Sequence, residues 1–198
     1  MSTRARHRRD GAAGRRRPRL GPWILGAAAT LLAIVAVAAV WTVRGQGAPA
    51  TPDFAMTAYQ GQDVLGGDDV LLSDLLGSGR PLVVNFWASS CPPCRLEMPG
   101  FQRVHDAHGG AFDLVGVDVG AFTGLGTHDG ARALIAEMDI RYPTAYAQDD
   151  DAVHGWELYS MPTTLFFSGD GRLVDRHTGY LAEPAFRARV DDLLASAP

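Results

Sequence analysis

The chain has 198 residues, enough for one domain of ordinary size and an appendage, and its charge is unevenly distributed. Residues 1–19 carry eight arginines against one aspartate, whereas residues 45–198 carry nine arginines against twenty-one acidic residues. A basic head is typical of a nucleic-acid arm, but the apolar segment that follows it argues against a nucleic-acid partner.

Residues 20–43 carry no charge and include the run GPWILGAAATLLAIVAVAAVW. A helix of this length spans roughly 36 Å, enough for a hydrocarbon core of about 30 Å. Trp23 and Trp41 lie near its ends, where tryptophan favours the membrane–water interface, and the preceding arginines favour a cytoplasmic N-terminus. We therefore expect a basic cytoplasmic tail over residues 1–19 and one uncleaved transmembrane anchor over residues 20–43, in a bacterial cytoplasmic membrane.

A cleaved signal peptide is the alternative to an anchor, because A-P-A at residues 48–50 resembles a cleavage site. The apolar stretch is longer than a typical signal core, and Arg44 separates it from that site. Residues 44–52 are rich in Gly, Ala and Pro and indicate a linker. Residues 53–198 then form a single domain on the extracytoplasmic side.

The remaining pattern predicts a mixed α/β sheet covered by helices. Leu82–Trp87 is an apolar run interrupted only by Asn85, as expected for a strand buried on both faces. Gly-rich residues 120–130 match no nucleotide-binding fingerprint, so we expect no cofactor. The predicted elements are a hairpin (54–58 and 70–72), a helical turn capped by Ser73 (73–76), a strand (82–87), a helix (92–108), a strand (112–119), two helices (131–138 and 151–159), a hairpin (163–167 and 172–178) and an amphipathic helix (183–195).

Both cysteines lie in the segment NFWASSCPPCRLEMP. Pro92 is favoured as a first helical residue, which places the Cys91 sulfur at the positive end of a helix dipole, where a thiolate is stabilised. Cys94 follows almost one turn later, close enough to bridge. An exposed attacking thiol backed by a resolving thiol suits thiol–disulfide exchange.

Two other interpretations of the cysteines are weaker. A zinc site with His105 and His108 fails because His105 lies roughly 16 Å from Cys94 along the same helix, so we expect no metal and half-buried or exposed histidines. A purely structural bridge closes so short a loop that it restricts the unfolded chain little.

The segment around the cysteines resembles the signature of membrane-anchored, thioredoxin-like thiol–disulfide oxidoreductases of the TlpA/ResA/CcmG type. The resemblance covers roughly residues 52–195. It implies a thioredoxin fold, with a mixed central sheet flanked by helices, an N-terminal hairpin extension and one N-terminal transmembrane helix. Further matching segments are P-D-F at 52–54, L-L-S-D-L at 71–75, Y-P at 142–143, M-P-T-T at 161–164 and G-D-G-R-L-V at 169–174.

The resemblance also implies residue roles. Cys91 is the attacking thiol and Cys94 the resolving one. Pro162 matches the proline that is cis in this fold and faces the disulfide, and the backbone of Met161 is expected to pair with an extended substrate segment. Ser90 and Trp87 complete the expected substrate-binding set, with Trp87 packed under the active-site turn. Ser90 stands where the family commonly has tryptophan.

Glu97 matches an acidic residue near the active site in the cytochrome-maturation branch of this family. Such a carboxyl can carry a raised pKa and shuttle the Cys94 proton, whereas the alternative is a solvated glutamate on an amphipathic helix. Asn85 occupies the position of a buried aspartate in ordinary thioredoxins, so Glu97 is expected to replace that proton acceptor. Arg95 either steadies the thiolate or is a simple exposed arginine.

These features predict an enzyme, a thiol–disulfide oxidoreductase that reduces disulfides in exported proteins, in particular the Cys-x-x-Cys-His haem site of apocytochrome c. It would need a membrane thiol-relay protein as electron donor, because no flavin or nicotinamide site is visible. One alternative is an oxidase that inserts disulfides into exported proteins. Another is a copper-binding assembly factor of the same general fold, which the two-residue spacing of the cysteines disfavours.

Overall fold

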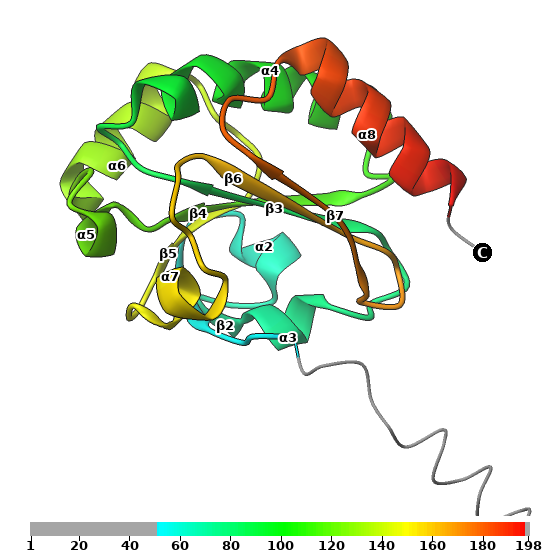
Figure 1. Ribbon diagram of the computed structural model, residues 1–198, viewed down its shortest axis with the longest axis horizontal. Coiled ribbons are helices and arrows are strands. Elements are labelled where there is room, and N and C mark those ends of the chain that lie inside the picture. The colour runs from blue at the N-terminus through cyan, green and yellow to red at the C-terminus, as the bar shows by residue number, and fades with distance from the viewer. Residues whose placement is uncertain (1–50, 197–198) are drawn as a thin grey trace, which may run out of the picture. The chain divides into compact units, whose positions relative to one another are not determined.

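The computed structural model describes residues 51–196, so the expected cytoplasmic tail, the transmembrane anchor and most of the linker lie outside the described residues. Seven strands form one sheet in the order β2-β1-β5-β4-β3-β6-β7 (Figure 1). Strands β3, β4 and β5 run parallel, and the other neighbours pair antiparallel. The strands are β1 (Ala55–Gln60), β2 (Asp69–Leu71), β3 (Leu82–Trp87), β4 (Asp113–Asp118), β5 (Thr144–Ala147), β6 (Thr163–Phe167) and β7 (Leu173–Thr178).

Helices cover both faces of the sheet (Figure 1). Three longer helices contribute to the core on one face: α4 (Pro92–His108), α6 (His128–Glu137) and α8 (Glu183–Ala195). Three short ones contribute to the core on the other: α2 (Gln62–Leu65), α3 (Leu72–Leu75) and α7 (Asp151–Gly155). Within the described residues, no helix is both long and apolar enough to cross a membrane.

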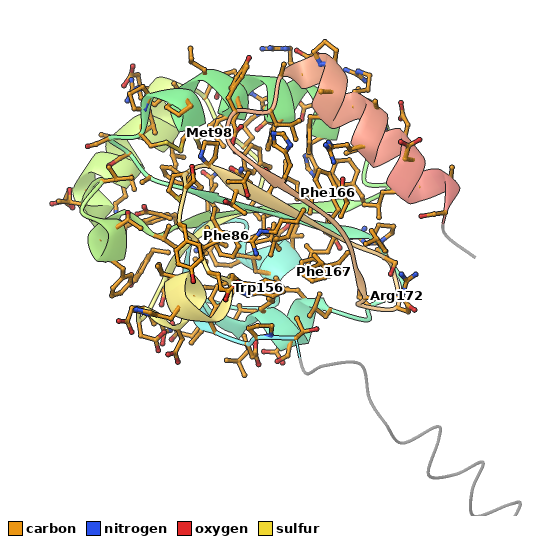
Figure 2. All side chains as sticks on the ribbon, in the orientation of Figure 1. Phe86, Met98, Trp156, Phe166, Phe167 and Arg172 are labelled. Carbon is orange, nitrogen blue, oxygen red and sulfur yellow. A yellow bond between two sulfur atoms is a disulfide. The ribbon has the colours of Figure 1, made fainter. Side chains whose placement is uncertain are left out.

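The alternation of side chains along the central strands explains their continuous apolar sequences. Phe166 of β6 lies in the core under α4 and α8, with Met98, whereas the next residue, Phe167, lies in the opposite core (Figure 2). Phe86 and Trp156 belong to that second core, and the Trp156 ring meets Phe167 edge-on at 5.8 Å. Because the central sheet is buried on both faces, its strands need apolar residues at nearly every position.

The predicted sheet, the N-terminal hairpin and the C-terminal hairpin and helix are all present. Helix α4 has the predicted bounds. It ends at His108 and is capped by Gly109, which adopts a left-handed conformation (φ 55°) that favours glycine. Strand β5 was not predicted, because its four residues carry too short a pattern. Pairing with β1 on one side and β4 on the other defines it.

Two predicted helix starts were wrong. Helix α3 begins at Leu72, and its first turn is capped by Asp74 and not by Ser73. The Asp74 carboxylate accepts the Leu71 N–H at 3.1 Å. Helix α6 begins at His128, three residues before the predicted start, because the Thr127 hydroxyl accepts the Gly130 N–H (3.1 Å) and caps it. The Gly-rich segment before it also contains an unpredicted helical turn, α5 (Gly120–Thr123).

Candidate active site

Cys91 ends the turn that follows β3 and caps the N-terminus of α4, with Pro92 as the first helical residue, as predicted. It forms a disulfide with Cys94, and the two Cα atoms lie 5.3 Å apart. The backbone N–H of Cys94 donates to the Cys91 sulfur at 3.3 Å. A thiolate at Cys91 would receive the same hydrogen bond together with the field of the helix dipole.

The disulfide is almost completely buried. The exposed fraction of Cys91 is 3% and that of Cys94 is zero. The expectation of an exposed attacking thiol is therefore wrong for this disulfide-bonded state. Both sulfurs belong to the core that also contains Trp87. The neighbours Ser90 and Pro92 are exposed. Of the two cysteines, Cys91 is the one that retains a small exposed surface.

Glu97 is buried, with 1% of its surface exposed, so the alternative of a solvated glutamate is wrong. It lies three residues after Cys94, which places the two side chains on the same side of α4, about 4.5 Å apart along the helix axis. Burial raises the pKa of Glu97 to about 7, although two hydrogen bonds to the carboxylate oppose this effect. The predicted rise in the Glu97 pKa is confirmed.

Two hydrogen-bond donors hold the Glu97 carboxyl in place. The side-chain amide of Asn85, from β3, donates to one oxygen at 2.9 Å, and the backbone N–H of Leu181 donates to the other at 2.9 Å. The same Asn85 amide nitrogen lies 3.1 Å from the Thr164 hydroxyl on β6. Both donors are neutral, and within residues 51–196 no cationic side chain forms an ion pair with Glu97. This arrangement suits a carboxyl that gains and loses a proton near neutral pH.

The predicted substrate-binding residues come from two segments. The Met161–Pro162 peptide bond is cis, as the resemblance implied, and it directly precedes β6. Met161 is half-buried and packs against the core that contains the cysteines, and Ser90 is exposed beside Cys91. Trp87 is fully buried and therefore offers a substrate no surface; it packs under the active-site turn.

Arg95 forms an ion pair with Glu137 of α6 at 2.8 Å, which favours its interpretation as a surface arginine. His105 and His108 are both half-buried, as expected, and burial lowers the pKa of His105. His108 contacts Asp191 of α8 at 3.0 Å. Within residues 51–196, no three His, Cys, Asp or Glu side chains gather as a metal site.

Residues of the connection between β4 and α6 also touch the active-site turn, and none of them was predicted as a site residue. The Leu125 carbonyl accepts the Ser90 N–H at 2.7 Å. Asp118, at the end of β4, is the register partner of Trp87 and is 2% exposed. The signal that could have identified Asp118 is a single acidic residue near the end of a buried apolar strand.

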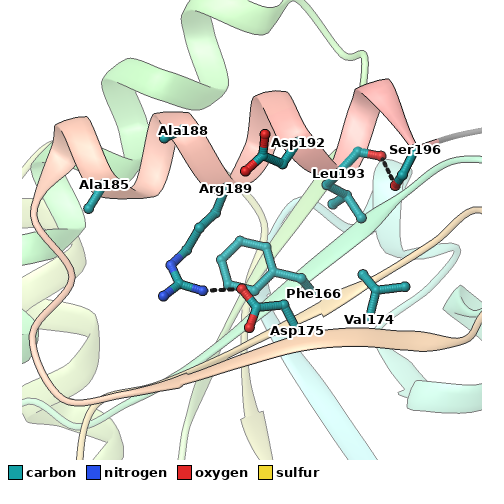
Figure 3. A pocket seen from close by; sticks show the side chains of 9 residues that line it. All are labelled: Phe166, Val174, Asp175, Ala185, Ala188, Arg189, Asp192, Leu193 and Ser196. Carbon is teal, nitrogen blue, oxygen red and sulfur yellow. Dashed lines mark hydrogen bonds and ion pairs between the residues drawn. The ribbon is translucent and has the colours of Figure 1, made fainter.

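A separate hollow of about 520 Å³ lies between β7 and α8 (Figure 3). Arg189 reaches across it from α8 to form an ion pair with Asp175 of β7. No residue of the active-site turn lines it, so it is not part of the candidate site. Its lining is Phe166, Val174, Asp175, Ala185, Ala188, Arg189, Asp192, Leu193 and Ser196.

Comparison with known proteins agrees with this geometry. The protein-family model described as the AhpC/TSA family matches residues 48–176. Thiol-disulfide oxidoreductase ResA of Oceanobacillus iheyensis is 30% identical over 145 residues, which cover 69% of this chain and 71% of ResA. Thiol:disulfide interchange protein HelX of Rhodobacter capsulatus is 31% identical over 121 residues, which cover 61% of this chain and 64% of HelX.

A solved structure supports the fold. StoA from Bacillus subtilis superposes with a TM-score of 0.57 at 22% identity, covering 72% of this chain and 99% of StoA. The mixed sheet, its flanking helices, the Cys-x-x-Cys pair at a helix N-terminus and the cis proline together make up a thioredoxin fold. The chain therefore belongs to the AhpC/TSA family and is a thioredoxin-like thiol–disulfide oxidoreductase of the ResA and HelX type.

Proposed function

We propose that this protein is an extracytoplasmic disulfide reductase in which Cys91 attacks, Cys94 resolves and Glu97 moves the proton. The observation that carries the proposal is the buried Glu97 carboxyl, one turn from Cys94, with a pKa raised to about 7. A carboxyl with that pKa is half ionised near neutral pH, where a general base for a thiol works best.

The reaction begins with the reduced pair. The Cys91 thiolate attacks one sulfur of a substrate disulfide, forms a mixed disulfide and expels the other substrate sulfur as a thiolate, which takes a proton from water. The Cys94 N–H, which lies 3.3 Å from the Cys91 sulfur in the disulfide-bonded state, supports the thiolate before attack. Cys91 lies next to the exposed Ser90 and retains a small exposed surface, whereas Cys94 has none, which suits Cys91 to this step.

The second step releases the product. The Glu97 carboxylate takes the Cys94 proton, and the resulting thiolate attacks the Cys91 sulfur. The Cys91–Cys94 bond forms, the mixed disulfide breaks, and the second substrate sulfur leaves as a thiolate that is then protonated. Two electrons have passed from the dithiol to the substrate, so the protein must be reduced again by a thiol donor.

The substrate surface includes Ser90, Met161 and Pro162. The segment that precedes β6 is suited to receive an extended chain alongside Met161 by strand addition. Ser90 has a small side chain, so it leaves room beside Cys91 for a bulkier substrate segment than tryptophan would. Trp87 supports the turn from below.

The substrate class and location rest on the sequence. Residues 20–43 would anchor the chain in the cytoplasmic membrane, with residues 44–52 as a linker and residues 53–198 outside. The substrates would be disulfides of exported proteins, in particular the haem-attachment cysteines of apocytochrome c. A membrane thiol-relay protein would supply the electrons.

The direction of electron flow is tested by the reduction potential of the Cys91–Cys94 pair, measured by equilibration with glutathione. A potential near or below about −250 mV supports a reductase. A potential above about −150 mV overturns the proposal and makes the protein a disulfide oxidase.

The role of Glu97 is tested by single-turnover kinetics of mixed-disulfide resolution in Glu97→Gln between pH 6 and 9. We expect resolution at pH 7 to slow by about a hundredfold, the low end of the range for loss of a general base. Glu137→Gln is the matched control because it removes one exposed carboxylate, on α6. Equal rates in wild type and Glu97→Gln across this pH range would contradict the shuttle.

A further inference from the structure

A second buried carboxylate, Asp118, lies on the same face of the sheet and has no part in the proposed reaction. Its backbone pairs with Trp87 in the β3–β4 register, four residues before Cys91. The Tyr59 hydroxyl donates to one carboxylate oxygen at 2.9 Å, and the Gly120 N–H donates to the other at 2.8 Å. Each oxygen of a buried side chain thus has its own donor.

These two hydrogen bonds reach both ends of the connection between β4 and α6. Gly120 begins α5, directly after Asp118 and Val119. At the other end, the Tyr59 oxygen lies 2.9 Å from Nδ1 of His128, the first residue of α6. Since Tyr59 donates its hydroxyl hydrogen to Asp118, its oxygen accepts from the His128 Nδ1–H. Asp118 therefore fixes the start of the connection directly and its end through Tyr59.

Aromatic packing keeps the Tyr59 ring in position. The Tyr146 ring lies 5.2 Å from the Tyr59 ring and 4.2 Å from the His128 ring. The Arg132 guanidinium lies 4.8 Å from the centre of the Tyr59 ring, within the range of a cation–π contact. Tyr59 is thereby held by contacts that do not depend on its hydroxyl.

The connection held in this way, residues 119–127, contacts the active-site turn through its backbone. The Leu125 N–H donates to the Gly120 carbonyl at 3.1 Å, and the Leu125 carbonyl accepts the Ser90 N–H at 2.7 Å. Gly126 packs so closely on Ser89 that a Cβ there would overlap the Ser89 hydroxyl. A continuous set of hydrogen bonds thus runs from Asp118 to the residue before Cys91.

We propose that Asp118, acting through Tyr59 and Gly120, is a positioning residue that holds residues 119–127 against the active-site turn and thereby stabilises the Cys91 thiolate. The proposal rests on the role of Cys91 in the proposed function. A turn fixed by Leu125 keeps the Cys91 sulfur in line with the Cys94 N–H and the α4 dipole. Release of the turn weakens both interactions, which favour the thiolate.

Two variants test the proposal in the full-length protein. Tyr59→Phe removes the hydroxyl but keeps the packed ring, and Asp118→Asn keeps the size of the side chain but removes its charge. Tyr146→Phe is the matched control: it removes a hydroxyl from the same aromatic cluster, and no hydrogen bond of Tyr146 to Asp118 or His128 is seen in the described residues. Hydrogen exchange of the Ser90 amide reports the turn directly, with amides of α8 as a reference for global unfolding.

We expect the Ser90 amide to exchange about tenfold faster in Tyr59→Phe and Asp118→Asn, which corresponds to the loss of one hydrogen bond. The equilibrium constant for oxidation of the dithiol by glutathione should rise by about threefold or more, because the reduced form loses thiolate stabilisation. Tyr146→Phe should leave both quantities within about 1.5-fold of wild type, as expected when no hydrogen bond is lost.

Unchanged Ser90 exchange in both variants would overturn the proposal, and so would faster exchange with an unchanged glutathione equilibrium. The two proposals also fail in different ways. If the wild-type pair does not exchange with glutathione at all, the proposed function fails, whereas the Ser90 amide still reports whether Asp118 holds the turn.

Discussion

Glu97 and Asp118 are both carboxylates buried against the same face of the sheet, and burial raises the pKa of each. They differ in their partners. Two neutral amides donate to Glu97, one turn from Cys94. Asp118 instead accepts from the Gly120 N–H and from the Tyr59 hydroxyl, whose oxygen also contacts His128. In the two proposals, the same desolvation serves proton movement at Glu97 and a fixed geometry at Asp118, and the hydrogen-bond partners account for the difference.

The largest expected effect concerns the stability of the disulfide-bonded protein at different pH values. The pKa of Glu97 is about 7 in the fold against an ordinary 4.5, so the folded state retains a proton that the unfolded chain releases. Wild type should lose about 3 kcal/mol of unfolding free energy as the pH rises from about 4.5 to above 7. Glu97→Gln lacks this loss.

Denaturant unfolding of both proteins from pH 4 to 8 measures this difference. Asp118 titrates in both chains, so its contribution cancels in the comparison. Parallel stability curves for wild type and Glu97→Gln would contradict the raised pKa of Glu97.

The contact between residues 119–127 and the active-site turn is tested by Gly126→Ala. The added methyl group would overlap the Ser89 hydroxyl, so we expect a loss of about 2 kcal/mol in unfolding free energy. Adding Ser89→Ala to the same chain should restore part of that loss. Gly67→Ala, where a Cβ meets only a carbonyl oxygen at 3.8 Å, is the control and should change stability by less than about 0.5 kcal/mol. An equal loss of unfolding free energy in both glycine variants would contradict close packing at Gly126 as the cause.

The Asn85 amide should lower the pKa of Glu97, because its hydrogen bond favours the carboxylate. In Asn85→Leu the Glu97 pKa should rise to about 8, the change expected for one lost hydrogen bond to a charged group. Carbon-13 NMR of the Glu97 carboxyl measures it. Thr164→Val, which removes a partner of Asn85 but none of Glu97, should change it less. A Glu97 pKa at or below that of wild type in Asn85→Leu would contradict this assignment.

The smallest effect is expected for Arg95→Ala. The arginine is half-buried and its partner Glu137 is exposed, so solvent screens their ion pair, which should contribute less than about 0.5 kcal/mol to stability. The exchange rate with glutathione should also be unchanged, because Arg95 pairs with Glu137. A slower exchange in Arg95→Ala would support the alternative that Arg95 stabilises the Cys91 thiolate.

The parts of the fold that the sequence predicts well are those encoded locally. Pro92 and Gly109 mark the two ends of α4, and the apolar run of β3 shows its burial on both faces. Strand β5 was missed because distant partners on β1 and β4 define its four residues. At the active site, Cys91, Cys94 and Glu97 were identified from one short segment and the resemblance it carries.

Asp118 was missed for the same physical reason as β5. Its partner Tyr59 lies 59 residues away in the chain, and Tyr59 and His128 are separated by 69 residues. No local pattern indicates that a tyrosine in the first strand will donate to an aspartate at the end of the fourth. Only the register of the sheet brings them together.

The N-terminal hairpin also determines which strands lie at the edges of the sheet. By pairing with β5, strand β1 removes β5 from the edge of the sheet within the described residues. The edges that remain are β2, which has only three residues, and β7, which carries the charged residues Asp175 and Arg176. Short and charged edges are poor templates for strand pairing between molecules, so we expect the hairpin to limit edge-to-edge association of this sheet.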